Sequence, residues 1–302
     1  MDYVIELQGG IGKHIMATSF IKWLNEKYPD SKIKVVSAYP EIFEYNPRVY
    51  RNLKMGQSYL FEDYIKGCDL RRGEPYSLIE YYRDENKMHC MKLFPKSYGF
   101  EIDENPVSEI YLTKGEEMDG TAYCMQNPNL ITLQPTGGLP PGTPYSKDKI
   151  DMDQRDMPHE LACKIVFLLN QKGYKVLQIR GAGERPIPDT LQLNLPFRNF
   201  LPIIKHAVAH IGIDSSAMHG AAIFKKPQLI FWGSTHKDNL GYFYPGVTNI
   251  SNKFGMHCRP FLQVNDMAGC FPFKDKNTGK EFNYSDEEIT KIVDNFLINL
   301  KK

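Results

Sequence analysis

A short apolar segment that runs into an acidic turn and two serines is the part of the sequence that could do chemistry most directly. Residues 208–213 are mostly apolar, and Asp214-Ser215-Ser216 follows them at the start of a predicted helix over 215–224. Free N–H groups at a helix N-terminus bind anions, and serine hydroxyls add donors beside them. An acidic residue at the carboxyl end of a strand lies where open α/β sheets hold ligands. The segment predicts an anion site, or else an ordinary strand–helix unit with Ser215 as the N-cap.

A second glycine turn lies near the N-terminus. A predicted strand leads into Gly9-Gly10-Ile11-Gly12-Lys13, and an apolar helix follows. A Walker A loop would need a glycine at Leu7 and a serine or threonine at His14. A dinucleotide-binding fingerprint would need a third glycine near Ile15 and an acidic residue after the next strand. The sequence has none of these, so both common phosphate loops are excluded.

Composition restricts the class of protein. The 302 residues are enough for two domains, and 42% hydrophobic with 24% charged residues is ordinary for a globular protein. The net charge of +1 gives no general electrostatic attraction to nucleic acid or anionic membranes. The six cysteines have no framework spacing, which suits a reducing compartment. No apolar run reaches membrane-spanning length and no signal peptide is visible, so we expect a cytoplasmic protein.

Strand and helix patterns alternate along the chain, which predicts an α/β protein with parallel sheets. The predicted strands are 2–7, 32–37, 108–112, 130–133, 174–179, 208–213 and 227–232, and the predicted helices are 12–28, 76–93, 159–171, 199–207, 215–224 and 285–300. The polar segment 113–129 is the predicted linker. The domains are then 1–125 and 126–284, and the C-terminal helix, within 285–302, is expected to pack back onto the first domain. Ser285 and Glu288 form a capping box at the start of that helix.

Several of these motifs resemble glycosyltransferase family 9, the ADP-heptose:lipopolysaccharide heptosyltransferases. Gly10-Ile11-Gly12 with Ala17-Thr18 resembles the family's opening. Residues 212–222 resemble its Asp-Thr-Gly and His-x-Ala-Ala signature, and residues 231–235 resemble its Phe-Gly-x-Thr turn. Arg155-Asp156-Met157-Pro158 stands where the family has a basic residue and a Trp-Pro pair, and residues 181–184 fit a glycine turn. The resemblance implies a GT-B fold, in which two Rossmann-like domains with parallel sheets face each other across a cleft.

The resemblance also implies roles for single residues. Asp214 would contact the donor sugar or ribose, and Ser215, Ser216 and Ala217 would donate to the diphosphate. Arg155 would neutralise the charge of the departing phosphates; the alternative is that it is a solvated loop arginine. No metal or cofactor would then be required. His219 would either approach the nucleotide or pack beneath the loop. The remaining predicted donor- or substrate-binding residues are Gly10, Gly12, Thr136, Gly181, Gly233, Ser234 and Thr235.

The sequence departs from the family at the expected general base. An aspartate commonly follows the first glycine turn there, whereas this chain has Lys13. A lysine is protonated at neutral pH and cannot be that base without strong desolvation. We therefore expect Lys13 to bind an acceptor phosphate or the donor diphosphate, with solvent exposure as the alternative. His14 is either a substitute base or a histidine on the helix surface.

These observations predict an inverting glycosyltransferase that uses a nucleoside diphosphate-sugar, with ADP-heptose as the donor suggested by the family. The acceptor would be a glycan, a lipopolysaccharide core, another hydroxyl compound or a modified nucleic-acid base. The alternatives are a nucleotide-sugar-binding relative without catalysis and, less favoured, an NAD-dependent oxidoreductase. His257, Cys258 and Cys270 lack a fourth ligand at zinc spacing, so we interpret them as structural. The aromatic run 242–245 would stack on a base or pack as a loop.

Overall fold

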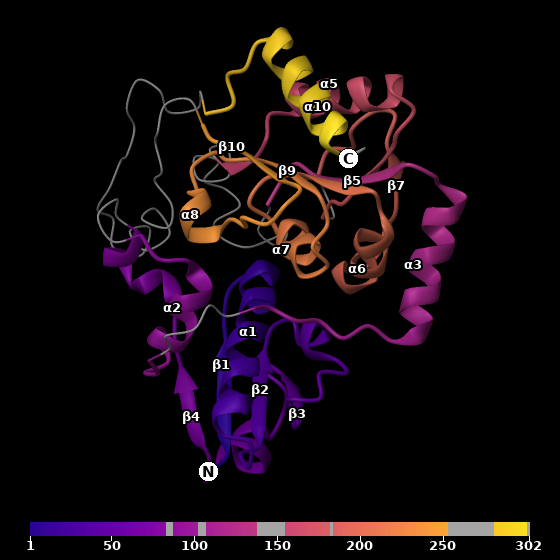
Figure 1. Cartoon of the computed structure of the whole chain (residues 1–302). Coiled ribbons are helices and arrows are strands. Elements are labelled where there is room, and N and C mark those ends of the chain that lie inside the picture. The colour runs from indigo at the N-terminus through magenta and orange to yellow at the C-terminus, as the bar shows by residue number, and fades with distance from the viewer. Residues whose placement is uncertain (83–86, 102–106, 138–154, 182–183, 253–280, 301–302) are drawn as a thin grey trace. The chain divides into compact units, whose positions relative to one another are not determined.

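The chain forms two compact α/β units, Met1–Thr113 and Lys114–Lys302. The computed structural model describes residues 1–82, 87–101, 107–137, 155–181, 184–252 and 281–300. Each unit has one sheet, and all the strand pairs of both sheets are parallel (Figure 1). The α/β class and the restart of the pattern near residue 130 are confirmed.

The first unit has a four-stranded sheet in the order β3-β2-β1-β4. Its strands are β1 Tyr3–Leu7, β2 Ile33–Ser37, β3 Arg51–Lys54 and β4 Asp69–Arg72. Its helices are α1 Ile11–Lys27 and α2 Cys90–Ser97, with short 3-10 or π turns at Pro40–Phe43, Phe61–Ile65, Pro75–Ser77 and Ile79–Tyr82. The predicted helix over 76–93 is therefore wrong as a continuous element, and residues 108–112 form no strand.

The second unit has a six-stranded sheet in the order β10-β9-β8-β5-β6-β7. Its strands are β5 Leu130–Gln134, β6 Lys175–Gln178, β7 Leu191–Gln192, β8 Ala209–Gly212, β9 Gln228–Phe231 and β10 Val247–Ile250. Its helices are α3 Lys114–Gln126, α5 His159–Gln171, α6 Phe197–His206, α7 Ser216–Ile223, α8 Lys237–Leu240 and α10 Asp286–Leu300.

Helices cover both faces of this second sheet (Figure 1). Alternate residues of β5 point to opposite faces, so that Ile131 and Leu133 join a core with α5 and α10. Leu130 joins the other core, with α6, α7 and the partly buried Tyr123 and Cys124 of α3. Burial on both faces explains why β5 is apolar at successive positions, as central strands of parallel sheets are.

The segment expected to be a linker is helix α3 instead. Arg198 of α6 pairs with Glu116 of α3, at 2.6 Å from Nε to Oε1. A Cβ on Gly120 would lie 2.6 Å from the Pro202 carbonyl carbon, so glycine permits the close approach of the two helices. The helix is difficult to predict from the sequence because its apolar residues have little helical periodicity. The boundary between the units accordingly falls after Thr113, earlier than predicted.

The C-terminal helix α10 also differs from the expectation. Its buried residues Ile289, Val293, Phe296 and Leu297 belong to the core that β5 and α5 form in the second unit. The predicted capping box is present, because Glu288 N donates to Ser285 Oγ (3.2 Å) and Ser285 N donates to Glu288 Oε2 (2.7 Å). The apolar face of α10 is thus buried within the second unit, which corrects the prediction that it packs onto the first.

Candidate active site

The strand order of the second sheet reverses between β5 and β8. The chain continues from β5 through β6 and β7 on one side, then returns to β8, β9 and β10 on the other. Ligands of open α/β sheets bind at such a reversal, outside the carboxyl ends of the strands. Asp214, Ser215 and Ser216 follow β8 directly, so they lie at this edge, as predicted.

Gln134, at the end of β5, caps helix α7 on the other side of this reversal. Its Oε1 accepts a hydrogen bond from Ala217 N (2.9 Å) and another from Ser216 Oγ (3.3 Å). Ser215 occupies the N-cap position, but its side chain makes no capping hydrogen bond. Its buried Oγ has no hydrogen-bond partner within the described residues. Gln134 is not among the predicted residues, because its only signal in the sequence is a polar residue at the end of an apolar strand.

Asp214 lies beside a buried histidine and a tyrosine from a later segment. His219 Nε2 is 3.6 Å from Asp214 Oδ1, and His219 Nδ1 is 2.9 Å from the Tyr242 hydroxyl. The Asp214 and His219 side chains are only 9% and 3% exposed. The histidine therefore packs beneath the loop, next to the carboxylate it could orient. Tyr242 was expected to stack on a base or to pack in a loop, and it makes an edge-on contact with the His219 ring.

The turn after β9 lies at the same edge of the sheet, because β9 pairs with β8. Ser234 and Thr235 are buried, and Ser234 Oγ has no hydrogen-bond partner within the described chain. Asn252, after β10, donates through Nδ2 to the Gly233 carbonyl (2.9 Å) and so holds the turn. Because β8 pairs with β9, the unpartnered hydroxyls of Ser215 and Ser234 follow adjacent strands.

The loops after β5 and β6 bring further predicted residues together. Thr136 Oγ1 donates to Glu184 Oε2 (2.6 Å), and Glu184 N closes a turn onto the Gly181 carbonyl (3.3 Å). Arg155 donates through Nη2 to the Gly137 carbonyl, and Gly137 N donates to Asp156 Oδ1 (2.8 Å). The Arg155 side chain is 14% exposed, so it is not a solvated loop arginine.

The first unit has its own strand reversal, between β1 and β4, and the N-terminal glycine turn lies there. Gly10 is the N-cap of α1, with Gly12 in its first turn. Lys13 Nζ lies 2.8 Å from both carboxylate oxygens of Glu74, which comes shortly after β4. The ammonium also lies 4.0 Å from the centre of the Tyr76 ring. Lys13 therefore has a carboxylate partner, Glu74, which no sequence motif indicates.

His14 is buried, and it is not the surface histidine considered as one alternative. Its Nδ1 lies 3.0 Å from the Gly10 carbonyl, and its ring meets Tyr39 edge-on at 5.1 Å. Nε2 is buried without a hydrogen-bond partner within the described residues. Burial lowers the pKa of His14 below its ordinary value. The imidazole is therefore neutral at neutral pH.

A second buried histidine, His210 in β8, makes the stability of the second unit sensitive to acid. Its Nδ1 lies 3.0 Å from Thr132 Oγ1, and burial lowers its pKa to about 3. The unfolded chain takes up a proton near pH 6.5, whereas the folded chain does not until about pH 3. Stability is therefore full above pH 6.5 and falls by about 1.4 kcal/mol per pH unit as the pH drops through this window.

Urea unfolding between pH 7.5 and 5.5 tests this expectation. His210→Gln should flatten the pH dependence, whether or not it lowers stability at pH 7.5. His159→Gln, at the partly buried first residue of α5, is the matched control and should keep the wild-type slope. An equal slope in wild type and His210→Gln would contradict the assignment.

Neither a metal-ligand group nor a membrane-spanning helix is found in the described part of the chain. No three His, Cys, Asp or Glu side chains converge there as metal ligands would. Among the same residues, no helix combines the length and the apolar character that crossing a bilayer requires. The predicted structural residues His257, Cys258 and Cys270 lie outside the described residues.

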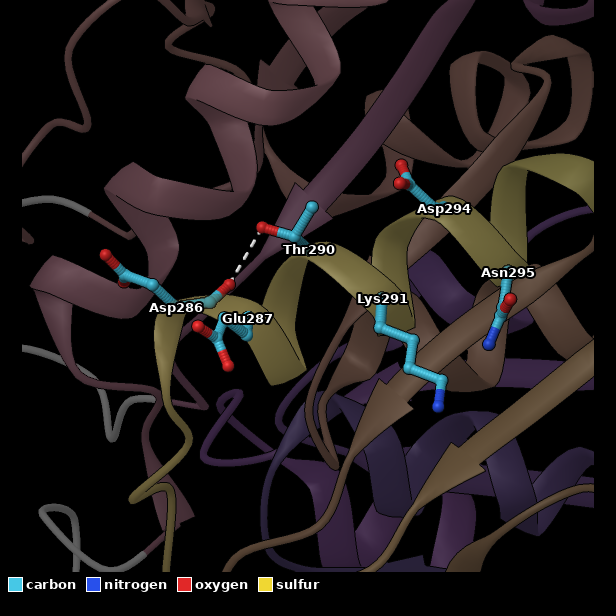
Figure 2. A pocket seen from close by; sticks show the side chains of 6 residues that line it. All are labelled: Asp286, Glu287, Thr290, Lys291, Asp294 and Asn295. Atoms are coloured by element: carbon cyan, nitrogen blue, oxygen red, sulfur yellow. Dashed lines mark hydrogen bonds between the residues drawn. The ribbon is translucent and has the colours of Figure 1, made fainter.

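A pocket on α10 is unrelated to the strand edges. Figure 2 shows that its lining side chains come from this one helix and spread along it. They are Asp286, Glu287, Thr290, Lys291, Asp294 and Asn295. The Thr290 hydroxyl donates to the Asp286 carbonyl of its own helix (2.8 Å). Because these groups do not converge, we assign the pocket to the outer face of α10.

Comparison with solved structures identifies proteins with a similar fold. No protein-family model matches the sequence, and none of the curated proteins matches it. Solved structures match over the whole chain. A glycosyl transferase family 9 protein from Veillonella parvula is 12% identical, with 98% of this chain and 97% of that chain covered and a TM-score of 0.67.

Two Escherichia coli proteins are similar in the same way. ADP-heptose lipopolysaccharide heptosyltransferase II is 13% identical, with 100% of both chains covered and a TM-score of 0.68. The dodecameric iron-containing heptosyltransferase TibC, in complex with ADP-D-β-D-heptose, is 13% identical, with 99% of this chain and 76% of that chain covered and a TM-score of 0.62. The two parallel sheets and these matches show that the chain has the GT-B-like fold of the family 9 heptosyltransferases.

Proposed function

We propose that this protein is a glycosyltransferase that takes a sugar from a nucleoside diphosphate-sugar and transfers it with inversion to a hydroxyl acceptor. The observation that carries the proposal is the strand edge of the second unit. A buried carboxylate, Asp214, stands there beside the buried and unpartnered hydroxyl of Ser215. Buried polar groups normally have partners, so a hydroxyl without one at the edge where open α/β sheets bind ligands favours a ligand that supplies the partner.

The chemistry of the edge suits a diphosphate-sugar. Asp214 would accept hydrogen bonds from sugar or ribose hydroxyls, and Ser215, Ser216 and the turn 233–235 would donate to phosphate oxygens. Arg155, which donates to the Gly137 carbonyl, would balance the charge of the departing diphosphate. These donors allow the reaction without a metal ion, which we include in the proposal. Binding of ADP-heptose by TibC makes an ADP-heptose-like donor the first to test.

Gln134 occupies one of the backbone N–H donors at the N-terminus of α7. The Ala217 N–H, which the family resemblance assigned to the diphosphate, donates to Gln134 Oε1 instead. The proposed phosphate donors are therefore chiefly hydroxyl groups. A diphosphate that also used the Ala217 N–H would have to displace the amide of Gln134.

Thermal unfolding with a panel of nucleotides tests the proposal. Saturating ADP or a nucleotide-sugar should stabilise the protein by about 2.7 kcal/mol at 100 times the Kd, whereas AMP should stabilise it less. The panel would include UDP, GDP and ADP-heptose, each with and without EDTA. Stabilisation that survives EDTA supports metal independence. If no diphosphate nucleotide raised the Tm, the proposal would be wrong.

A binding protein without transferase activity is the second candidate. The specific observation in its favour is that Lys13, at the position of the family's base, is a cation held in an ion pair. Tight binding of a nucleotide-sugar without hydrolysis or transfer across a broad acceptor panel would favour this candidate.

A further inference from the structure

We infer that Gln134 binds a phosphate oxygen of the nucleoside diphosphate through its side-chain Nε2, while its Oε1 stays bound to the N-terminus of α7. The inference rests on the proposed function and deepens it, because it names a residue that distinguishes a diphosphate from an uncharged ligand. Every residue that carries it belongs to the second unit.

The partners of the Gln134 amide fix its orientation. Oε1 accepts a hydrogen bond from Ala217 N (2.9 Å) and another from Ser216 Oγ (3.3 Å). A backbone N–H can only donate, so the atom that it meets is the amide oxygen and not the amide nitrogen. The nitrogen, with its two N–H donors, is therefore left for another partner.

That nitrogen has no partner in the described part of the chain. Gln134 makes no hydrogen bond there through Nε2, and Nε2 is not one of the fully buried polar atoms. The residue as a whole is 9% exposed. Gln134 is thus nearly enclosed, but its amide nitrogen can be reached from outside.

Gln178, the last residue of the neighbouring strand β6, shows how a structural glutamine is held in the same sheet. Its Oε1 accepts from Ile187 N (2.8 Å) and from Gln192 Nε2 (2.9 Å), and its Nε2 donates to the Arg185 carbonyl (3.2 Å). Both ends of that amide are bound within the protein. Gln134 has only its oxygen end bound, which favours a ligand for the other end.

Strand pairing brings Gln134 to the start of α7. Gln134 pairs with Gly212 of β8, and a Cβ on Gly212 would lie 2.7 Å from the Gln134 carbonyl oxygen, so glycine permits this close approach. Ser215, the N-cap of α7, follows with a buried hydroxyl that has no partner among the described residues. Two unpartnered polar groups therefore belong to one helix N-terminus.

An anion is the ligand that suits this arrangement. An amide nitrogen only donates, so the ligand atom has to be an acceptor. The N-terminus of a helix favours negative charge. The Ala217 N–H polarises the amide through Oε1, and a polarised amide is a stronger donor at its nitrogen. Gln134 would in this way extend the anion preference of α7 to a phosphate oxygen beyond the side chain.

Calorimetric titration of Gln134→Ala and Gln134→Glu tests the inference. The probe is whichever of ADP, UDP and GDP stabilises the wild type most, and its own nucleoside is the uncharged comparison. Gln134→Ala loses one hydrogen bond to a charged group and should bind the diphosphate roughly 10- to 100-fold more weakly. Gln134→Glu keeps an oxygen acceptor for α7 but replaces the N–H donors with a negative charge, so it should bind more weakly still. Neither variant should change the affinity for the nucleoside.

Two controls separate the loss of a ligand contact from other effects. Gln171→Glu adds the same negative charge at the exposed end of α5 and should bind both probes like wild type. Gln134→Glu should keep the wild-type Tm without ligand, because its carboxylate still accepts from the N-terminus of α7.

Three results would overturn the inference. The first is diphosphate binding by Gln134→Ala as tight as that of the wild type or tighter, since a tighter complex would mean that the glutamine only blocks the helix N-terminus. The second is an equal loss of nucleoside and diphosphate affinity, which would indicate a structural role. The third is wild-type affinity for the diphosphate in Gln134→Glu, which decides alone if Gln134→Ala does not fold.

The two proposals fail in distinguishable ways. If the wild type binds none of the diphosphate nucleotides, the proposed function is wrong and this inference falls with it. If the wild type binds one of them and both Gln134 variants bind it equally well, the proposed function stands and only the role of Gln134 is wrong.

Discussion

Replacing Asp214 with alanine is expected to weaken the binding of a nucleoside diphosphate-sugar by roughly 10- to 150-fold. This corresponds to about 1.5–3 kcal/mol, the range for one hydrogen bond to a charged group. The carboxylate is buried at the carboxyl end of β8, where an open sheet holds its ligand. Titration calorimetry with the nucleotide-sugar that stabilises the wild type most would give the affinity.

Two further variants make the Asp214 result specific. Asp214→Asn keeps an oxygen acceptor but loses the charge, so its affinity should lie between those of wild type and Asp214→Ala. Glu287→Gln removes one negative charge at an exposed position of α10 and should bind like wild type. Unchanged affinity in Asp214→Ala would mean that the carboxylate serves only the fold, through its contact with His219.

His219, which is itself held by Tyr242, lies beside the Asp214 carboxylate. The tyrosine hydroxyl meets one ring nitrogen of His219, and the other ring nitrogen faces Asp214 Oδ1. The hydrogen bond at one nitrogen of a histidine determines which tautomer the other nitrogen presents. The three side chains come from the turn after β8, from α7 and from the segment after α8, so the folded unit preorganises them before a ligand binds.

The sequence predicts the central elements of both units well. Strands β1, β5, β8 and β9 are short apolar runs, and burial on both sheet faces produces such runs. Strand β4, with the sequence Asp-Leu-Arg-Arg, lies at a sheet edge and is only partly buried, so it has no such signal. Helix α3 escapes prediction because its close packing depends on a glycine and on ion pairs more than on an apolar stripe.

The candidate site was predictable only where one segment carries it. Asp214, Ser215 and Ser216 are contiguous, and their pattern after a strand is visible in the sequence. Gln134 meets the start of α7 only because β5 pairs with β8, and Lys13 meets Glu74 only because β4 pairs with β1. Pairing order across a sheet has no local signature, so sequence patterns alone could not connect Lys13 with Glu74.

Replacing Phe296 with alanine is expected to lower the free energy of unfolding of the second unit by about 3–5 kcal/mol, the usual cost of a large cavity in a core. The ring is 1% exposed and belongs to the core formed by β5, β8, α5 and α10. Hydrogen exchange followed by mass spectrometry would resolve the effect by segment. Peptides that contain β5 or β8 should lose protection, whereas peptides that contain β1 or β2 should not.

Ile298 provides the matched control for this last substitution. It lies on the same helix and is 56% exposed, so Ile298→Ala should change stability by no more than about 0.5 kcal/mol. The comparison also tests the assignment of α10 to the second unit. If Phe296→Ala instead reduced protection in β1 and β2 and left β5 unchanged, the helix would stabilise the first unit, as the sequence alone suggested.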